Sequence, residues 1–401
     1  MITLENIQKA QQTVKDISYK TPISRAPILS KNLNANIYLK KENLQVTGSF
    51  KLRGAFNKIA SISEDKRTLG VVAASAGNHA QGVAFSASHF DIDATIFMPE
   101  ATPLTKVTGV KHYGANVILK GTNYDEAYKY ALEFAKEHNQ TFVHPFADDK
   151  VIEGQGTIAL EILDEVSSPD IIIVPIGGGG LISGMATVMK QKSPNTRIIG
   201  VVSSGANAMK QSFEAKTPID STSVKTIADG IAVRDTTPKM LDFILELVDD
   251  IIEVNDTEIA NAILFLLERH ILVVEGAGAV GIAALMHKKI DVTNKTVVLP
   301  LSGGNIDVTM LSQIIEKGLV KSYRKMNMII TLVDKPGSLM KFTEILKECD
   351  ANIVQIDYDR SSVKLEFGEA YVTVALETKG EEHQSQIRTT LEENEYKVKE
   401  F

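Results

Sequence analysis

Short runs of β-branched residues recur from residue 69 to residue 305, and each is followed by a turn and then by a stretch with helical periodicity. The runs are LGVVAAS (69–75), ATIFMP (94–99), NVILKG (116–121), IIIVPIGGGG (171–180), RIIGVV (197–202) and TVVLPLSGGN (296–305). Strands that alternate with helices in this way predict an α/β fold with parallel sheets covered by helices. We predict two such layers up to about residue 318. The smaller one, at about residues 45–145, is inserted in the larger one, against which the first 40 residues pack.

The pattern changes after residue 318. Four strand-like runs and two helical stretches follow one another between residues 326 and 401 in the order β-α-β-β-α-β. This order is typical of a small α+β unit with a ferredoxin-like fold. We therefore predict a main domain at residues 1–318 and a separate C-terminal domain at residues 326–401.

The composition indicates a cytoplasmic globular protein. The chain has 43 basic and 50 acidic residues and a net charge of -7, which argues against a basic surface for nucleic acid. Its single cysteine, Cys349, excludes a disulfide or a cysteine-based zinc site within the chain, and the histidines show no metal-ligand spacing. No apolar run approaches the roughly 20 residues needed to span a bilayer, and the N-terminus lacks a signal-peptide pattern. We expect no metal, no membrane partner and no nucleic-acid partner.

A lysine in the segment TGSFKLRGA is the first candidate for chemistry. Most lysines are exposed, and Lys51 could lay its stem along Phe50 and Leu52 with its amine in water. Ser49, however, is a suitable N-cap for a helix that opens at Phe50, which would put Lys51 in the first turn. At this positive end of the helix dipole a neutral amine is favoured over an ammonium, as Schiff-base chemistry requires.

The strongest local motif is a glycine run between a buried strand and a helix, in IIIVPIGGGGLISGMATVMKQ. The run exposes backbone N–H groups where a helix begins, which is an arrangement that binds phosphate, although such runs also form tight turns. It comprises Gly177, Gly178, Gly179 and Gly180 and leads into Leu181. A dinucleotide requires an acid at the end of the next strand to bind its ribose, but RIIGVVSSG offers only serines there. A compact monophosphate therefore fits better.

Two further loops carry polar groups directly after a strand. The loop SAGNH presents Ser75, Gly77, Asn78 and His79, whose hydroxyl, amide and N–H donors could hold a carboxylate or could simply cap a helix. The loop LSGGN places Ser302 after another strand. A candidate lysine, a monophosphate cup and donors on three loops together suggest pyridoxal phosphate and an amino-acid substrate.

With these motifs the chain resembles the threonine ammonia-lyases (threonine dehydratases), which are pyridoxal-phosphate enzymes of the tryptophan-synthase-β-like class, or fold type II. TGSFKLRGA is similar to the family's lysine motif, SAGNHAQG to its asparagine loop, GGGGL to its phosphate cup and SGGN to its contact with the pyridine nitrogen. TIADGIAV and VVEGAGAVG resemble later signatures, and LVDKPGSLMKF resembles the first loop of an ACT domain, an amino-acid-sensing module. The resemblance implies a catalytic region at residues 1–318 and an ACT-like regulatory domain at residues 326–401.

The resemblance also implies a role for each motif residue. Lys51 would hold the cofactor covalently, with Phe50 against its ring and Asn78 at its phenolic oxygen. The N–H groups of Gly177–Leu181 would bind its phosphate, and Ser302 would contact its ring nitrogen. The freed amine of Lys51 would then take the α-proton of the substrate, and the β-hydroxyl would leave. The expected products are 2-oxobutanoate and ammonia from L-threonine, and pyruvate from L-serine as a secondary activity.

Two positions in these motifs bear on specificity and on the cofactor. The resemblance assigns substrate binding to the loop of Ser75, Ala76, Gly77, Asn78 and His79. Serine racemases of this class carry a serine where this chain has Ala76, so racemisation is expected to be poor. Glu275 in VVEGAGAVG either faces the cofactor or caps the helix that follows.

Several alternatives stay open at this point. A serine racemase or another β-elimination or β-replacement enzyme would use the same cofactor, and a non-enzymatic amino-acid sensor would use only the ACT-like domain. The family implies a homo-oligomer, a tetramer or a dimer. The effector of the ACT-like domain, whether isoleucine, valine or none, does not follow from the sequence, and neither does a biosynthetic or a catabolic role.

Overall fold

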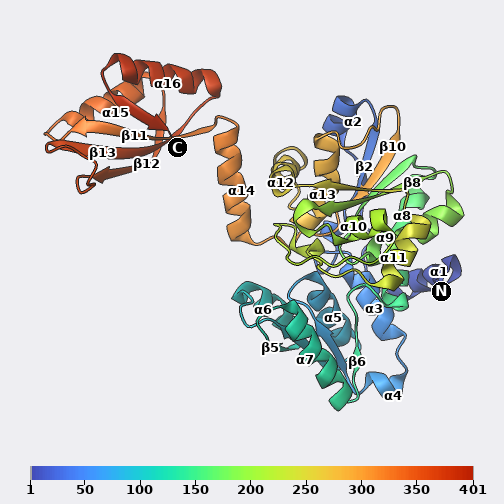
Figure 1. Cartoon of the computed structure of the whole chain (residues 1–401). Coiled ribbons are helices and arrows are strands. Elements are labelled where there is room, and N and C mark those ends of the chain that lie inside the picture. Colours follow the sequence, from blue (N-terminus) through green and yellow to red (C-terminus); the bar gives the residue numbers. More distant parts are fainter. Residues whose placement is uncertain (1, 401) are drawn as a thin grey trace. The chain divides into compact units, whose positions relative to one another are not determined.

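The computed structural model describes residues 2–400. The chain folds into two compact units (Figure 1). The first is Met1–Ile306 and the second is Asp307–Phe401. The boundary lies before the predicted residue 318, because helix α14 (Val308–Lys321) groups with the second unit. Which unit is catalytic and which is regulatory stays a prediction at this stage.

The larger sheet of the first unit has six strands. In spatial order they are β1 (Ile23–Arg25), β2 (Asn36–Lys40), β10 (Thr296–Pro300), β7 (Ile171–Pro175), β8 (Arg197–Ser203) and β9 (Asp250–Val254). All neighbours are parallel except β1 and β2, which are antiparallel. Because β2 pairs with β10, and β1 pairs with β2, the first 40 residues contribute two strands to this sheet, which agrees with the prediction that they pack against the larger layer.

The smaller sheet of the first unit is entirely parallel. Its order is β5 (Asn116–Leu119), β4 (Ala94–Met98), β3 (Val71–Ala74) and β6 (Thr141–Phe142). The helices of this smaller layer are α3 (Lys51–Ala60), α4 (Glu64–Arg67), α5 (Asn78–His89), α6 (Leu104–Lys111) and α7 (Tyr124–Glu137). The predicted α/β class with two parallel layers is therefore confirmed.

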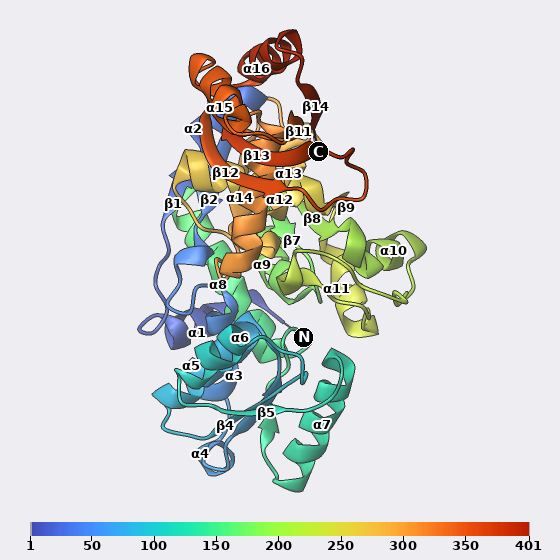
Figure 2. The ribbon, with the colours of Figure 1, turned by 90° about the vertical axis from the view of Figure 1, so that its left-hand side faces the viewer.

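The remaining helices of the first unit accompany the larger sheet (Figure 2). They are α1 (Leu4–Val14), α2 (Pro27–Leu33), α8 (Asp149–Glu165), α9 (Gly180–Lys192), α10 (Ala208–Ala215), α11 (Pro238–Leu247), α12 (Asp256–His270) and α13 (Gly276–Met286), with the 3-10 turns η1 (Glu42–Leu44), η2 (Ser204–Ala206) and η3 (Asp229–Ile231). Side-chain caps fix several helix starts, such as Asp148 for α8 and the Asn255–Glu258 capping box for α12.

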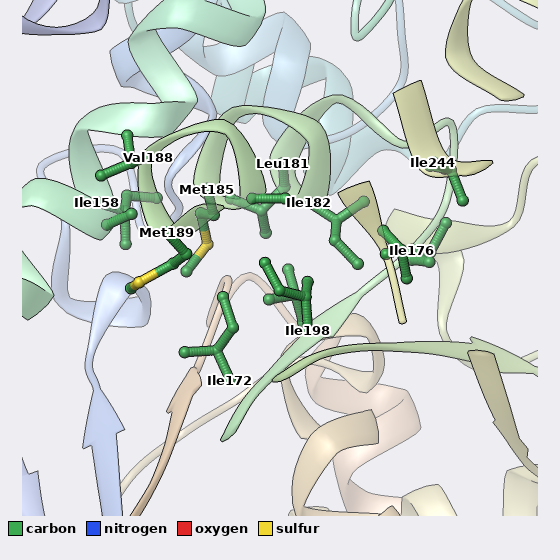
Figure 3. Packing of buried hydrophobic residues seen from close by; sticks show 14 of the residues in the cluster. Ile158, Ile172, Ile176, Leu181, Ile182, Met185, Val188, Met189, Ile198 and Ile244 are labelled. Atoms are coloured by element: carbon green, nitrogen blue, oxygen red, sulfur yellow. The ribbon is translucent and has the colours of Figure 1, made fainter. Parts of the chain in front are cut away.

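The main core lies where α8 and α9 cover strands β7 and β8 (Figure 3). Ile172 and Ile198 come from the strands, and Ile182 and Met185 come from α9. These four side chains are fully buried. Burial of such a side chain stabilises the fold by about 1.5–3 kcal/mol, so this core holds α9 firmly on the sheet.

The backbone of helix α8 approaches the backbones of two other helices, α3 and α9, directly. A Cβ atom on Gly54 of α3 would lie 2.6 Å from the Val151 carbonyl, and one on Gly154 would lie 2.5 Å from the Arg53 carbonyl. On another face of α8, a Cβ on Gly184 of α9 would lie 2.4 Å from the Ile152 carbonyl. Glycines at these crossings allow α3, α8 and α9 to pack without intervening side chains.

The second unit follows the predicted order β-α-β-β-α-β after α14. Its elements are β11 (Lys325–Val333), α15 (Ser338–Glu348), β12 (Asn352–Asp359), β13 (Glu369–Glu377), α16 (Glu381–Glu393) and β14 (Lys397–Glu400). The four strands form an antiparallel sheet in the order β12-β13-β11-β14. Across residues 2–400, none of the helices combines the length and apolar character that a membrane-spanning segment requires.

Candidate active site

Tertiary contacts, rather than a cap, fix the start of the helix that carries the candidate lysine. Helix α3 begins at Lys51 with Phe50 as its N-cap residue, and no side chain caps it. The prediction that Ser49 caps this helix was therefore wrong. The backbone of Ser49 instead pairs with Gly303, and the Phe50 N–H donates to the Ser302 carbonyl at 3.1 Å. Lys51 still occupies the first turn, as expected.

The amine of Lys51 is half-buried and faces the interior of the site. Its Nζ donates to the Pro145 carbonyl at 3.1 Å and lies 5.3 Å from the centroid of the Phe50 ring. Burial lowers the pKa of Lys51 to about 8, and the charge of Glu275 opposes this effect. From the sequence we expected the helix dipole to lower the pKa of Lys51, whereas burial is the principal cause in the structure. A substantial fraction of the amine is therefore neutral near physiological pH.

Glu275 and Asn78 form the second part of the site. Glu275 precedes α13, but its side chain makes no cap hydrogen bond and is only 4% exposed. It accepts two hydrogen bonds from Asn78 Nδ2, at 2.7 and 2.9 Å. Burial raises the pKa of Glu275 to about 7, against the effect of these hydrogen bonds. Of the two roles left open for Glu275, the structure shows no side-chain cap, and the role beside the cofactor stays a prediction.

A residue that sequence reasoning did not assign, Asn305, orients the Asn78 amide. Asn305 Nδ2 donates to Asn78 Oδ1 at 2.7 Å and to the Thr47 carbonyl at 2.9 Å. With its oxygen engaged in this way, the Asn78 amide must direct its NH₂ group toward Glu275. The motif SGGN contained Asn305, but the sequence alone gave it no partner.

The loop after β10 brings Ser302 beside these groups. Ser302 is 2% exposed. A Cβ atom on the next residue, Gly303, would lie 2.4 Å from Glu275 Oε1 and 3.1 Å from Asn78 Nδ2. The Glu275 N–H also donates to the Gly303 carbonyl at 3.0 Å. A glycine is thus required here for Ser302, Glu275 and Asn78 to approach one another.

The glycine run forms the turn between β7 and α9. Gly179 is the N-cap residue and has a φ of +92°, a left-handed conformation that favours glycine. Within residues 2–400, the N–H groups of Gly177–Leu181 have no hydrogen-bond acceptor in the protein. A Cβ atom on Gly178 would lie 2.4 Å from the Phe146 ring. The glycines therefore leave a set of unpaired donors at a helix N-terminus.

These groups fit pyridoxal phosphate. Unpaired and mostly buried N–H groups at a helix start are suited to a phosphate, and a partly neutral amine is suited to covalent attachment of an aldehyde. The two features belong to one site, because the turn that contains Pro145 at the Lys51 amine also contains Phe146 at the glycine run. The other candidate residues connect to this site in sequence. Phe50, next to Lys51, bonds the Ser302 carbonyl, and Gly303, next to Ser302, bonds Glu275, which in turn bonds Asn78.

The predicted substrate loop lies between β3 and α5. Helix α5 begins at Asn78, and its N-cap residue Gly77 has no side chain to occupy the helix N-terminus. The Gly77 N–H donates to Ser75 Oγ at 3.2 Å, and Ala76 packs at the edge of the core of the smaller layer. His79 points inward: it is 3% exposed and its Nε2 bonds the Val143 carbonyl at 2.8 Å. Burial lowers the pKa of His79 to about 3, so its ring is neutral.

A buried ion cluster anchors α3 two residues beyond Lys51. Arg53 makes two hydrogen bonds to Glu42, both at 2.9 Å, and bonds Glu161 at 2.6 and 3.0 Å. Lys40 bonds Glu161 at 2.5 Å, so two cations balance two anions. Burial alone would lower the pKa of Arg53, but Glu42 and Glu161 more than offset it and raise that pKa. The cluster ties α3 to α8, and nothing in the sequence pattern indicated it.

Comparison with known proteins identifies the family. Residues 14–303 match the family model described as "Pyridoxal-phosphate dependent enzyme". The chain is 46% identical over 399 residues to an L-threonine ammonia-lyase of Thermotoga maritima, covering 100% of this chain and 99% of that one. It is 45% identical over 323 residues to the L-threonine dehydratase catabolic TdcB of Staphylococcus aureus, covering 80% of this chain and 93% of the relative.

Solved structures agree with this assignment. The processed threonine deaminase isoform 2 of Solanum lycopersicum superposes with a TM-score of 0.73 at 36% identity, over 79% of this chain and 90% of that one. Maize serine racemase superposes with a TM-score of 0.75 at 34% identity, over 80% of this chain and 98% of that one. The fold and the site define a fold type II enzyme. The chain belongs to the family of pyridoxal-phosphate-dependent enzymes.

Proposed function

We propose that the chain is an L-threonine ammonia-lyase, which converts L-threonine to 2-oxobutanoate and ammonia and acts on L-serine as a secondary substrate. The observation that carries this proposal is the match to an L-threonine ammonia-lyase along essentially the full length of both chains. The site supports it, because a lysine with a lowered pKa, a buried carboxylate and a cup of free amides occupy one site.

Each group has a distinct task in this proposal. Bound pyridoxal phosphate supplies an electron sink for negative charge that develops on the α-carbon of the substrate. The N–H groups of Gly177–Leu181 would hold its phosphate, and Phe50 would lie against its ring. Ser302 would contact the ring nitrogen and Asn78 the phenolic oxygen, and Lys51 would attach it covalently. Because Ser302 carries a hydroxyl rather than a carboxylate, it would not force protonation of the ring nitrogen, which favours elimination over transamination.

The Lys51 amine is also the base of the reaction. Its pKa of about 8 gives it an appreciable neutral fraction near pH 7, which a general base requires. The free N-terminus of α5, with Gly77 as its N-cap residue, is suited to the substrate carboxylate. Ser75, Ala76 and Asn78 flank this position on the same loop, and His79 contributes its backbone because its ring points inward.

Steady-state deamination tests the proposal. Purified holoenzyme is expected to release 2-oxobutanoate from L-threonine faster than pyruvate from L-serine. Lys51→Ala should abolish both reactions and keep the fold, whereas Lys111→Ala, at an exposed lysine of α6, should retain parent rates. Substantial turnover by Lys51→Ala would overturn the assignment of the base. Parent protein that consumes neither amino acid would overturn the assigned function.

Serine racemisation is the second candidate, because maize serine racemase superposes well on this chain. Racemisation needs an acid on the face of the ring opposite the lysine, and serine racemases of this class carry a serine there. This chain has Ala76, which has no proton to give. Chiral analysis of the products from L-serine separates the two functions: a lyase yields pyruvate, whereas a racemase yields D-serine with little keto acid. A β-replacement enzyme would instead require a second nucleophilic substrate.

We further propose that the second unit is an ACT-like regulatory domain and that the protein is a cytoplasmic homo-oligomer. The β-α-β-β-α-β order and antiparallel sheet of this unit support the first proposal. Deamination rates with and without isoleucine or valine test it, and rates that neither amino acid changes would leave the domain a role in assembly alone. Light scattering of the purified protein distinguishes a dimer or tetramer from a monomer.

A further inference from the structure

A tight turn at residues 144–147 joins the two halves of the site. His144 Nδ1 accepts hydrogen bonds from two backbone N–H groups, those of Phe146 at 3.2 Å and of Ala147 at 2.9 Å. Since Nδ1 accepts both, the network assigns the imidazole proton to Nε2. The ring therefore closes the turn in the way that an aspartate or asparagine side chain closes an Asx turn.

The turn makes one contact on each side. The carbonyl of Pro145, inside the turn, accepts the hydrogen bond from Lys51 Nζ at 3.1 Å. The ring of Phe146 packs so closely on the glycine run that a Cβ on Gly178 would lie 2.4 Å from it, and a Cβ on Gly180 would lie 3.0 Å from the Phe146 Cα. One short segment thus touches both the amine and the phosphate-binding amides.

The surroundings of His144 keep its ring neutral. Burial lowers the pKa of His144 to about 4. Of the charged groups around it, Asp148 opposes this shift, and Lys51 and Lys239 reinforce it. Apolar contacts complete the environment, with the Phe146 ring 4.7 Å away edge-on and the rings of Tyr128 and Phe142 farther off. Nδ1 consequently remains a hydrogen-bond acceptor throughout the physiological range.

We propose that His144 is a positioning residue for the cofactor site. Its imidazole closes the turn that aims the Pro145 carbonyl at Lys51 and seats Phe146 on the glycine run, and this sets the spacing between the amine and the phosphate cup. His144 touches neither the cofactor nor the substrate in this role. The proposal depends on the family's cofactor, but it does not depend on which amino acid is the substrate.

Two substitutions of His144 distinguish the role of its hydrogen-bond acceptor from the role of ring packing. In His144→Asn, the side-chain Oδ1 can accept the same two N–H bonds, whereas His144→Leu keeps bulk but has no acceptor. Loss of two such hydrogen bonds predicts that His144→Leu weakens binding of pyridoxal phosphate by about 10-fold or more. His144→Asn should stay within about threefold of the parent. His112→Leu, at an exposed histidine of the same layer, is the matched control and should bind like the parent.

The primary measurement is titration of the cofactor-free full chain with pyridoxal phosphate, followed by absorbance. The second readout is the pH profile of Lys51 modification in the cofactor-free protein by an amine reagent, quantified by mass spectrometry. Without the aimed carbonyl, His144→Leu should shift the midpoint of this profile away from that of the parent, whereas His144→Asn should retain it. Neither readout depends on turnover of an amino acid, so a failed assignment of substrate does not affect the test.

Three results would overturn the proposal. The first is parent affinity in His144→Leu, and the second is an equal loss in His144→Asn and His144→Leu, which would make ring packing the cause. The third is a lower melting temperature in His144→Leu with no change in affinity or in the Lys51 profile. If His144→Leu does not fold, His144→Asn decides alone: a folded variant with parent affinity supports the proposal, and one that binds 10-fold more weakly refutes it.

Discussion

Removal of the Lys51 amine should stabilise the cofactor-free protein at neutral pH. The structure lowers the pKa of Lys51 from 10.5 to about 8, chiefly by burial. The folded state therefore binds fewer protons than the unfolded state between these two values. The cost to stability is fully present below pH 8 and disappears as pH rises toward 10.5. The active-site lysine thus destabilises the fold that carries it, as groups at functional sites commonly do.

The size of the effect follows from this gap in pKa. A gap between 10.5 and about 8 corresponds to about 3 kcal/mol at pH 7. Lys51→Met keeps the apolar stem but loses the hydrogen bond to the Pro145 carbonyl, which costs about 1 kcal/mol. We therefore expect the variant to be more stable than the parent by about 2 kcal/mol at pH 7. At pH 9 the advantage should be smaller by about 1 kcal/mol.

Hydrogen exchange measures this difference within the first unit. Protected amides of α3 and α8 report the opening free energy of that unit in the cofactor-free full chain. Lys111→Met, at an exposed lysine of α6, is the control and should stay within about 0.5 kcal/mol of the parent at both pH values. If Lys51→Met were less stable than the parent at pH 7, or if its advantage did not narrow by pH 9, the inference that burial lowers the pKa of Lys51 would be wrong.

Three further predictions test other parts of the site. Arg53→Met leaves two buried carboxylates with a single cation and should lower the opening free energy that hydrogen exchange measures in α3 by about 3–5 kcal/mol. An unchanged opening free energy would show that the ion cluster does not stabilise α3. Gly178→Ala forces a methyl group into the Phe146 ring and should weaken the binding of pyridoxal phosphate at least about 10-fold in titrations. The control is Gly109→Ala, where a Cβ meets nothing closer than 3.8 Å, and this variant should bind like the parent. Glu275→Gln should stabilise the cofactor-free protein by up to about 3 kcal/mol at pH 8 but by less than about 1 kcal/mol at pH 5. The reason is that the pKa of Glu275, raised from 4.5 to about 7, destabilises the parent increasingly as pH rises from 4.5. Equal stabilisation by Glu275→Gln at the two pH values would contradict this explanation.

The sequence predicted the parts of the fold that a local pattern specifies. Runs such as those of β7 and β10 are continuous, apolar and followed by glycine, so their position and parallel arrangement followed from the pattern. Strand β9, Asp250–Val254, was missed because acidic residues precede and interrupt a run that is only partly buried. The start of α3 was misjudged because contacts with Ser302 and Gly303, more than 200 residues away in the chain, override the local preference for a serine cap.

Residues that act through partners remote in sequence could not be predicted in the same way. Arg53, Glu42 and Glu161 are charged, and charged side chains are rarely fully buried unless paired. Their pairing depends on α3 and α8 lying together, which no local pattern reveals. His144 was overlooked for a related reason, because a histidine before a proline has no specific signature until its ring is seen to close a turn. The asparagine loop, the glycine run and Ser302 were found because each follows the end of a strand, whereas Lys51 was found from the predicted start of a helix.

The close packing around α8 explains how motif residues more than 100 positions apart in the sequence form one site. Lys51 begins α3 and the glycine run begins α9, and α8 contacts both helices at backbone distance through Gly54, Gly154 and Gly184. Any larger residue at these crossings would push one helix away and change the spacing between amine and phosphate cup. The Arg53–Glu161 ion pair adds a directional bond along the same crossing, since Glu161 lies on α8. The lysine can therefore keep an unfavourable, half-buried position, because helix contacts that do not involve its amine hold the backbone from which its side chain extends, and the 144–147 turn then positions the amine itself.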